Sequence, residues 1–160
     1  MEEIYSRRSI REYTDEKIPD AVLDRILKAG MNAPSARNLK PYEFVIVRNK
    51  NSLTELSLIK KHAYMVKESD AAIVVLGKQD SEFWQLDLGA TIQNILLEAT
   101  HLGVGSCWVG INQVQMELLR QKLNIPNDIY PISMISLGYP KENKNQNNNY
   151  YEDKIRHEKY

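Results

Sequence analysis

The chain has 160 residues, 42% of them hydrophobic, and its 21 Lys and Arg residues balance 21 Asp and Glu residues to a formal net charge of zero. This length predicts one domain with a sizeable core, and the charge balance argues against general binding to nucleic acids or membrane surfaces. No apolar run approaches the ~20 residues of a membrane-spanning helix, and the N-terminal segment lacks the apolar core of a signal peptide. A single cysteine, Cys107, excludes an intramolecular disulfide and favours a cytoplasmic protein.

Hydrophobic periodicity and turn residues predict helices and strands that alternate along the chain, which by itself is typical of a parallel α/β sheet. In chain order, we expect a short helix at 2–6, a helix opened by Ile18-Pro19-Asp20 and running to about Met31, a strand at Glu43–Arg48, a helix at Asn51–Ile59, a strand at Ala71–Gly77, a helix at Trp84–Leu102 ended by Gly103, a strand at Ser106–Gly110, a helix at Val114–Lys122 and a strand at Ile132–Leu137.

Two of these elements carry a prediction about burial. Ala71–Gly77 is apolar throughout, so we expect this strand to be covered on both faces. In the helix near the C-terminus, Val114, Leu118 and Leu119 are expected to point inward. The other connections, predicted as loops or left without an element, are Tyr13–Lys17, Asn32–Tyr42 and Lys60–Asp70.

The C-terminal region changes in composition twice. Lys141–Asn149 (KENKNQNNN) is polar and of low complexity, which predicts a flexible linker. The last eleven residues, Tyr150–Tyr160, regain tyrosines and charges, so we expect them to pack, with a partner subunit as one candidate. Because no internal repeat is visible, we interpret residues 1–140 as a single domain and 141–160 as its linker and arm.

Two stretches point to a ligand. In Arg7-Arg8-Ser9-Ile10-Arg11, each guanidinium offers a planar set of donors that suits a phosphate or an electron-rich ring, and Ser9 adds a hydroxyl. A solvated basic patch is the alternative. The small residues of Ala33–Asn38 (APSARN) allow close approach of a flat ligand, and Asn38 can both donate and accept. An ordinary helix-to-strand connection is the alternative here. The two stretches together favour an anion site with a ring beside it.

The inventory of reactive groups favours a bound cofactor. The three histidines have no metal-ligand spacing, no Ser-His-Asp pattern or carboxylate pair is visible, and nothing near Cys107 in sequence would activate its thiol. Gly103–Gly110 is not a dinucleotide fingerprint, because it precedes a strand and its spacing differs. Gly110 instead allows a ring to approach the main chain. An enzyme without its own acid, base or nucleophile relies on a cofactor.

Three further basic residues have two interpretations each. Lys154 and Arg156 alternate in the tail, so in an extended strand they would point the same way. They are either part of a solvated terminus or a further pair of phosphate ligands. Lys67 is likewise either a solvated residue or a ligand.

Taken in order, RRSIREY, APSARNLKPYEF, the long helix ending in HLGVGSCWVG, and LGYPKE resemble the FMN-dependent nitroreductase family along almost the whole chain. The resemblance implies an α+β, three-layer fold with a central mixed, largely antiparallel sheet flanked by helices, in place of the parallel sheet that alternation suggests. It also implies a homodimer with FMN at the interface and a C-terminal arm that reaches the partner subunit.

The resemblance assigns roles position by position. It implies that Arg7, Arg8, Ser9 and Arg11 bind the phosphate and ribityl chain, with one basic side chain at the pyrimidine edge of the ring. The loop laid against the isoalloxazine by the other subunit corresponds to Pro34, Ser35, Ala36 and Asn38. The stretch that supplies a main-chain N–H to flavin N5 corresponds to Val109 and Gly110. The remaining basic positions correspond to Lys154 and Arg156 near the phosphate and Lys67 near the ring.

The implied activity is NAD(P)H-dependent oxidoreduction, in which NADH or NADPH gives hydride to flavin N5 and a nitroaromatic, quinone or similar acceptor then takes it, by a ping-pong mechanism. One departure bears on the acceptor: Lys40-Pro41-Tyr42 stands where the family usually has Gln-Pro-Trp. The alternatives are a dehalogenase or oxygen-dependent flavin enzyme of the same fold, and a non-enzymatic flavin-binding or sensing protein. No motif specifies the physiological acceptor, the nicotinamide donor, or one- versus two-electron reduction.

Overall fold

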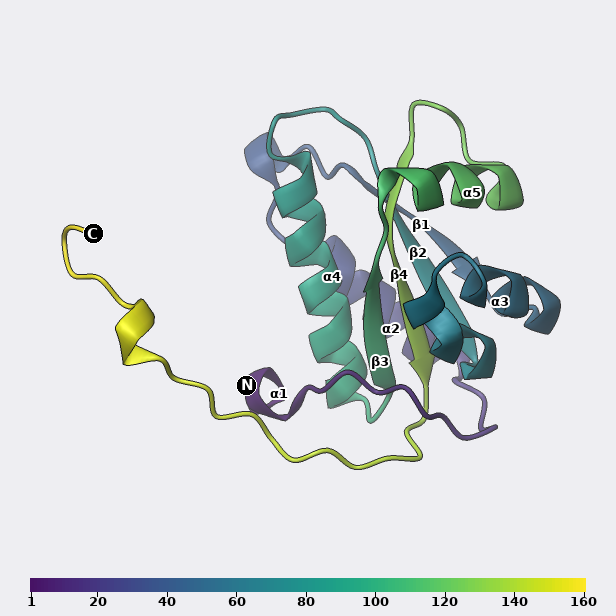
Figure 1. The fold of residues 1–160 in the computed structure, drawn as a ribbon, viewed down its shortest axis with the longest axis horizontal. Coiled ribbons are helices and arrows are strands. Elements are labelled where there is room, and N and C mark those ends of the chain that lie inside the picture. Colours follow the sequence, from purple (N-terminus) through teal and green to yellow (C-terminus); the bar gives the residue numbers. More distant parts are fainter.

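Four antiparallel strands form one sheet in the order β1-β2-β4-β3, as seen in the computed structural model, which describes residues 1–160 (Figure 1). The strands are β1 Tyr42–Val47, β2 Ala71–Gly77, β3 Gly105–Gly110 and β4 Tyr130–Gly138. All three strand pairs are antiparallel, and one isolated parallel bridge joins Ser9 to Ser106.

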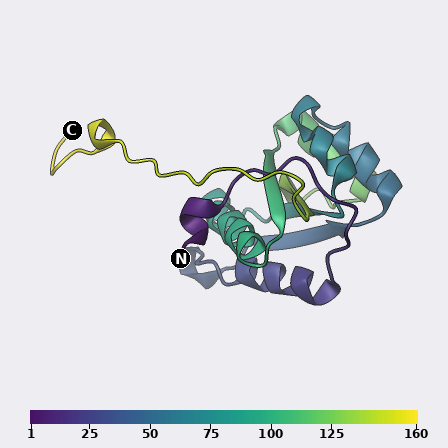
Figure 2. The same ribbon diagram turned by 90° about the horizontal axis from the view of Figure 1, so that it is seen from below.

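Helices cover both faces of this sheet and complete a three-layer α+β fold (Figures 1 and 2). The helices are α1 Glu3–Ser6, α2 Asp20–Met31, α3 Lys50–Ser57, α4 Trp84–His101 and α5 Gln113–Leu123, with 3-10 turns at Ala36–Asn38, Lys61–Glu68 and Glu152–Lys154. Helices α2 and α4 pack on one face, and α3, the turn at 61–68 and α5 pack on the other. None of the helices combines the length and the apolar composition needed to cross a membrane.

Strand β2 lies at the centre and is buried along its whole length, as its unbroken apolar run predicts. Successive side chains of a strand point to opposite faces. Ile73 and Val75 therefore join the core beneath α2 and α4, whereas Ala72 and Val74 join the core beneath α3 and α5. Fully burying a Val or Ile side chain contributes roughly 1.5–3 kcal/mol, so β2 is the element on which both cores depend.

The parallel sheet that alternation suggests is wrong, and the largely antiparallel sheet implied by the resemblance is confirmed. The reason lies in the connection from β1 to β2, where α3 leads the chain away and the 3-10 turn at 61–68 brings it back. The Lys50 ammonium at the start of α3 donates to the carbonyl of Lys67 near the end of the turn. The chain thus re-enters the sheet at the end it left, and β2 must run against β1.

Tyr13 opens a stretch predicted as a polar loop, and it is instead an anchor in the core with 3% of its surface exposed. Its hydroxyl lies 2.7 Å from both the Ile10 carbonyl, to which it donates, and Ser136 Oγ. Burial raises the pKa of Tyr13, so the phenol stays protonated. A β-carbon at Gly138 would lie 2.8 Å from the Tyr13 ring, so only glycine leaves room for it. This anchor holds the N-terminal segment to β4.

The first part of the predicted linker at Lys141–Asn149 makes hydrogen bonds to the rest of the chain. Residues 141–147 run beside the N-terminal segment as a strap: Lys141 N–H donates to the Glu12 carbonyl at 2.9 Å, and Asn147 N–H donates to the Tyr5 carbonyl at 3.1 Å. Polar composition hides this pairing, because the strap binds through backbone and charged groups. Beyond it, residues 148–160 are exposed and extend away from the body (Figures 1 and 2).

Helix α5 buries Leu119 fully, but the prediction that Val114 and Leu118 also point inward is wrong. Val114 is 72% exposed and Leu118 is 40% exposed. The inward face repeats around Leu119 at i±4, which takes in Gln115 and Leu123 and leaves the other two residues on the side. Helix α5 begins at a capping box in which the Asn112 side chain accepts from the Gln115 amide.

Candidate functional site

Two adjoining hollows lie along β3, with volumes of about 680 Å³ and 370 Å³. They share Lys60, Trp108 and Gly110. The larger is also lined by Arg7, Ser9, Gln93, Leu96, Ile111, Asn112 and Ile132. The smaller is also lined by Arg11, His62, Tyr64, Met65, Cys107 and Val109. These volumes lie in the 300–1,000 Å³ range of small-molecule and cofactor sites.

The N-terminal segment places every second side chain in these hollows. In an extended chain, side chains at i, i+2 and i+4 point the same way, and Arg7, Ser9 and Arg11 are the residues that line the hollows. Ile10 points to the other side, where it is 8% exposed and its Cγ2 would lie 2.8 Å from a β-carbon on Gly105. Arg8 also points away and donates to the Asn145 carbonyl of the strap.

Strand β3 presents free backbone groups to the same hollows. Ser106 accepts from Ile10 N–H at 2.9 Å, and Ile111 N–H donates to the Ile132 carbonyl at 3.1 Å. Backbone groups of an antiparallel strand alternate between its two edges, so Ser106, Trp108 and Gly110 direct theirs away from β4. A β-carbon on Gly110 would meet no heavy atom within 4 Å. The Gly110 amide is therefore open to a flat ring.

The electrostatics of the two hollows favour an anion. Arg7, Arg11 and Lys60 bring positive charge, and no carboxylate side chain lines either hollow. The Lys60 ammonium donates to the Gly110 carbonyl at 2.9 Å, which holds its charge beside the open amide. Burial raises the pKa of the Cys107 thiol, so this residue stays a thiol and offers no nucleophile.

Lys60 is a residue that sequence reasoning missed. Lys67, the basic position named from the resemblance, instead lies 3.8 Å from Glu68 and lines a separate hollow with Lys60 and Lys61. The available signal was the Lys60-Lys61 pair in a stretch to which no element could be assigned. The fold separates the two residues: Lys60 reaches Gly110 on β3, whereas Lys61 lines neither hollow.

The loop at Pro34–Asn38 lies at the other end of the molecule, at the start of α4. Ala36 N–H donates to both carboxylate oxygens of Asp87 at 3.1 Å, and Ser35 Oγ accepts from Lys40 N–H at 3.0 Å. The loop lines neither hollow of its own chain. Within one chain, Pro34, Ser35, Ala36 and Asn38 are thus not brought to the Arg7 segment, and their contact with a cofactor stays a prediction.

This loop is strained. Arg37, Asn38 and Lys40 have φ angles of 52°, 56° and 53°. Left-handed backbone is uncommon for Arg and Lys, and each such residue costs about 1–3 kcal/mol that the surrounding structure must hold. Strain of this kind clusters at ligand-binding loops, so the conformation favours a binding role over an ordinary connection.

Lys154 and Arg156 are exposed, and the tail that carries them extends away from the body of the same chain (Figure 1). Residues Glu152–Lys154 form a 3-10 turn, so Lys154 and Arg156 do not lie together in one extended strand. The Arg156 guanidinium lies 5.1 Å from the centre of the Tyr160 ring. Their role as phosphate ligands stays a prediction that requires a second chain.

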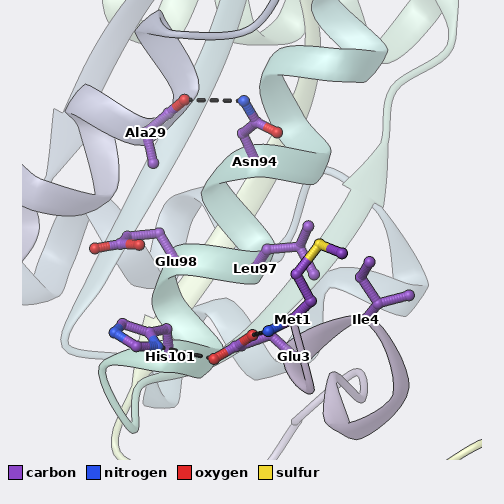
Figure 3. Close-up of a pocket in the computed structure, with 8 residues that line it drawn as sticks. All are labelled: Met1, Glu3, Ile4, Ala29, Asn94, Leu97, Glu98 and His101. Carbon is purple, nitrogen blue, oxygen red and sulfur yellow. Dashed lines mark hydrogen bonds and ion pairs between the residues drawn. The ribbon is translucent and has the colours of Figure 1, made fainter.

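A separate groove of about 310 Å³ runs between α1, α2 and α4 (Figure 3). Its apolar side chains include Ile4 and Leu97, and His101 Nδ1 lies 2.8 Å from Glu3 Oε1. The His101 hydrogen bond lowers the pKa of Glu3 to about 2. Glu98, the other acid of this groove, pairs with Arg25 at 2.8 Å. These carboxylates oppose anion binding, so the two hollows at β3 suit an anion better than this groove does.

The antiparallel sheet and its two helical layers define a nitroreductase-type fold that solved structures share. A structure described as "Putative NADH dehydrogenase/NAD(P)H nitroreductase", from Parabacteroides distasonis, matches with a TM-score of 0.95 at 35% identity, covering 99% of this chain and 97% of that one. A structure described as "a putative nitroreductase in complex with fmn", from Desulfovibrio desulfuricans, matches with a TM-score of 0.89 at 28% identity, covering 99% of this chain and 96% of that one.

Sequence comparison agrees. The model of the family described as "Putative TM nitroreductase" matches residues 1–159. An Archaeoglobus fulgidus protein named "Putative NADH dehydrogenase/NAD(P)H nitroreductase" is 41% identical, over 98% of this chain and 96% of its own length. The chain belongs to the nitroreductase family of oxidoreductases.

Proposed function

We propose that the chain binds FMN in the two hollows along β3 and uses it to oxidise NADH or NADPH and reduce a small acceptor, such as a nitroaromatic or a quinone, in a ping-pong reaction. The observation that carries this proposal is the convergence of Arg7, Ser9, Arg11 and Lys60 on the open amide of Gly110. When bound, FMN supplies the hydride acceptor at N5 and passes the electrons on.

The residues of the hollows fit this group. Arg7 and Arg11 offer charge-assisted donors to the phosphate, and Ser9 offers a hydroxyl. The Gly110 amide is free to donate to the ring, and Trp108, 44% exposed, offers an aromatic surface beside it. Lys60 adds positive charge at Gly110, where it stabilises negative charge on the reduced ring without a proton transfer from the protein.

A homodimer completes the proposed site. Helices α1 and α4 expose the large apolar side chains Ile4, Tyr5 and Leu86 at 52%, 56% and 72%, and a partner subunit would cover such side chains. A second copy on this surface supplies the strained loop at Pro34–Asn38 to the ring, and Lys154 and Arg156 of its tail to the phosphate. The single buried thiol and the need for a nicotinamide donor suit a cytoplasmic enzyme.

The test is an absorption spectrum of the purified protein after incubation with FMN, followed anaerobically as NADH or NADPH is added. A protein-bound flavin band that bleaches with either donor is the expected result and also identifies the donor. A band that persists with both donors contradicts the reductase and favours a flavin-binding or sensing protein. No bound flavin, even with excess FMN, contradicts the cofactor assignment.

A further inference from the structure

The strap at residues 141–147 turns two charged side chains toward the Arg7–Arg11 segment. Glu142 Oε1 accepts from the backbone N–H of Arg11 at 2.7 Å, and Lys144 Nζ donates to the backbone carbonyl of Ser9 at 2.7 Å. The two side chains also pair with each other at 3.0 Å, and both are about three-quarters buried, with 23% and 25% exposed. Their neighbours Lys141 and Asn143 are exposed.

These contacts pair with backbone groups that a neighbouring strand would otherwise pair with. Ile10 N–H pairs with Ser106 on β3. Because backbone groups alternate along an extended chain, the carbonyl of Ser9 and the N–H of Arg11 face the opposite side, away from β3. No other part of the chain pairs with these two backbone groups. Glu142 and Lys144 satisfy both groups with side chains that are already paired to each other.

The consequence concerns side-chain direction. The backbone of Ser9–Arg11 is held between β3 and the strap, so a backbone rotation that would turn the Cα–Cβ bond of Arg11 away from its hollow breaks hydrogen bonds on both sides. The pKa of Glu142 remains low in spite of partial burial, because the Arg11 amide and Lys144 favour the carboxylate. The acceptor is thus charged, and the contact strong, at neutral pH.

We propose that Glu142 and Lys144 are positioning residues that clamp the Ser9–Arg11 backbone in the alignment that binds the phosphate of FMN. This inference rests on the proposed function. It assigns the start of the C-terminal arm a role in cofactor binding within its own chain.

The clamp and simple electrostatics predict opposite effects on FMN binding when the Glu142 carboxylate is removed. Removing a negative charge near a cationic site strengthens anion binding if charge alone matters. If the carboxylate positions Arg11, its removal weakens FMN binding by about tenfold, the size of one hydrogen bond to a charged group. Glu142→Gln removes the same charge but keeps an oxygen that accepts from Arg11 N–H.

The experiment measures the Kd of the apo-protein for FMN by quenching of flavin fluorescence, with thermal unfolding of each apo-variant alongside. We expect E142A to bind FMN about tenfold more weakly than E142Q, and E142Q to bind at least as tightly as the unmodified chain. Because both variants lack the charge, the E142A-to-E142Q ratio should persist at high salt. Equal affinities for the two variants, or tighter binding by E142A, overturn the clamp.

A second pair of variants, at Lys144 and Lys141, keeps the test decisive if E142A does not fold. Lys144→Met keeps the aliphatic stem and removes the donor to Ser9. Lys141→Met removes the same charge from a strap residue whose only recorded contact is its backbone N–H. We expect K144M to weaken FMN binding several-fold more than K141M, and equal effects overturn the clamp. If the unmodified chain binds no FMN, the proposed function fails, and the clamp fails with it. If the unmodified chain binds FMN but the two variants of each pair bind it equally well, only the clamp is contradicted.

Discussion

Gly110 offers a direct test of where the flavin ring lies, because the apo-protein should tolerate a methyl group there and the cofactor should not. A β-carbon at this position meets nothing within 4 Å, so Gly110→Ala should change the free energy of unfolding of the apo-protein by no more than about 0.5 kcal/mol. A ring seated on the Gly110 amide would meet that carbon. Overpacking typically costs about 1–3 kcal/mol, and loss of the amide hydrogen bond adds about 0.5–1.5 kcal/mol.

Together these terms predict that G110A binds FMN with about 1.5–4.5 kcal/mol less free energy, which is roughly a 10- to 2,000-fold increase in Kd. Fluorescence quenching measures the Kd, and thermal unfolding of the apo-protein measures stability. Gly105→Ala is the matched control, because its β-carbon would lie 2.8 Å from Ile10 Cγ2. This control should lower the apo-protein's unfolding temperature by several degrees, at roughly 2–4 °C per kcal/mol. Wild-type FMN affinity in G110A would refute the placement of the ring.

Two further predictions concern the cofactor motif and the pH dependence of stability. Arg11→Ala should weaken FMN binding by about 1.5–3 kcal/mol, whereas Arg8→Ala should weaken it by less, because Arg8 binds the strap; a larger loss for Arg8 in calorimetric titration would reverse the assignment. Asp70, with 3% of its side chain exposed, accepts from Arg48 at 2.6 Å and Ile18 N–H at 3.0 Å. Burial raises the pKa of Asp70, but these donors and Lys17 outweigh it and leave the pKa below its ordinary value of 3.8. A carboxyl group whose pKa is lower in the folded state stabilises the fold at pH values above its unfolded-state pKa. This stabilisation is lost as the pH falls through the folded-state pKa. Asp70→Asn should therefore cost about 2 kcal/mol at pH 7 and progressively less below about pH 4; a pH-independent difference between the two unfolding curves would contradict this.

The local elements of the fold followed from local patterns. The apolar run at Ala71–Gly77 predicted a strand buried on both faces, and the structure has that strand with the same ends. The periodic segment from Trp84 predicted α4, which ends one residue earlier than expected and is followed by Gly103 at a φ of 72°. Such features depend on residues a few positions apart, so they are visible without the fold.

The candidate site was visible in part for the same reason. The Arg7–Arg11 motif stood out by residue type, and its assignment to a cationic hollow needed the extended backbone that turns Arg7, Ser9 and Arg11 one way and Arg8 the other. Composition described the segment at 141–149 as a linker, because it counts residue types and is blind to pairing partners.

By itself, the sequence determined the main helices and strands, the buried strand at Ala71–Gly77 and the basic segment at Arg7–Arg11. Through four ordered motifs, it also determined the family. Only the tertiary structure decided how α3 and the turn at 61–68 return β2 beside β1, the arrival of Lys60 at Gly110, and the contact of Glu142 with Arg11. The physical reason is distance along the chain. Residues 11 and 142 are 131 positions apart, and no local preference records a hydrogen bond that forms only after both segments have packed beside β3.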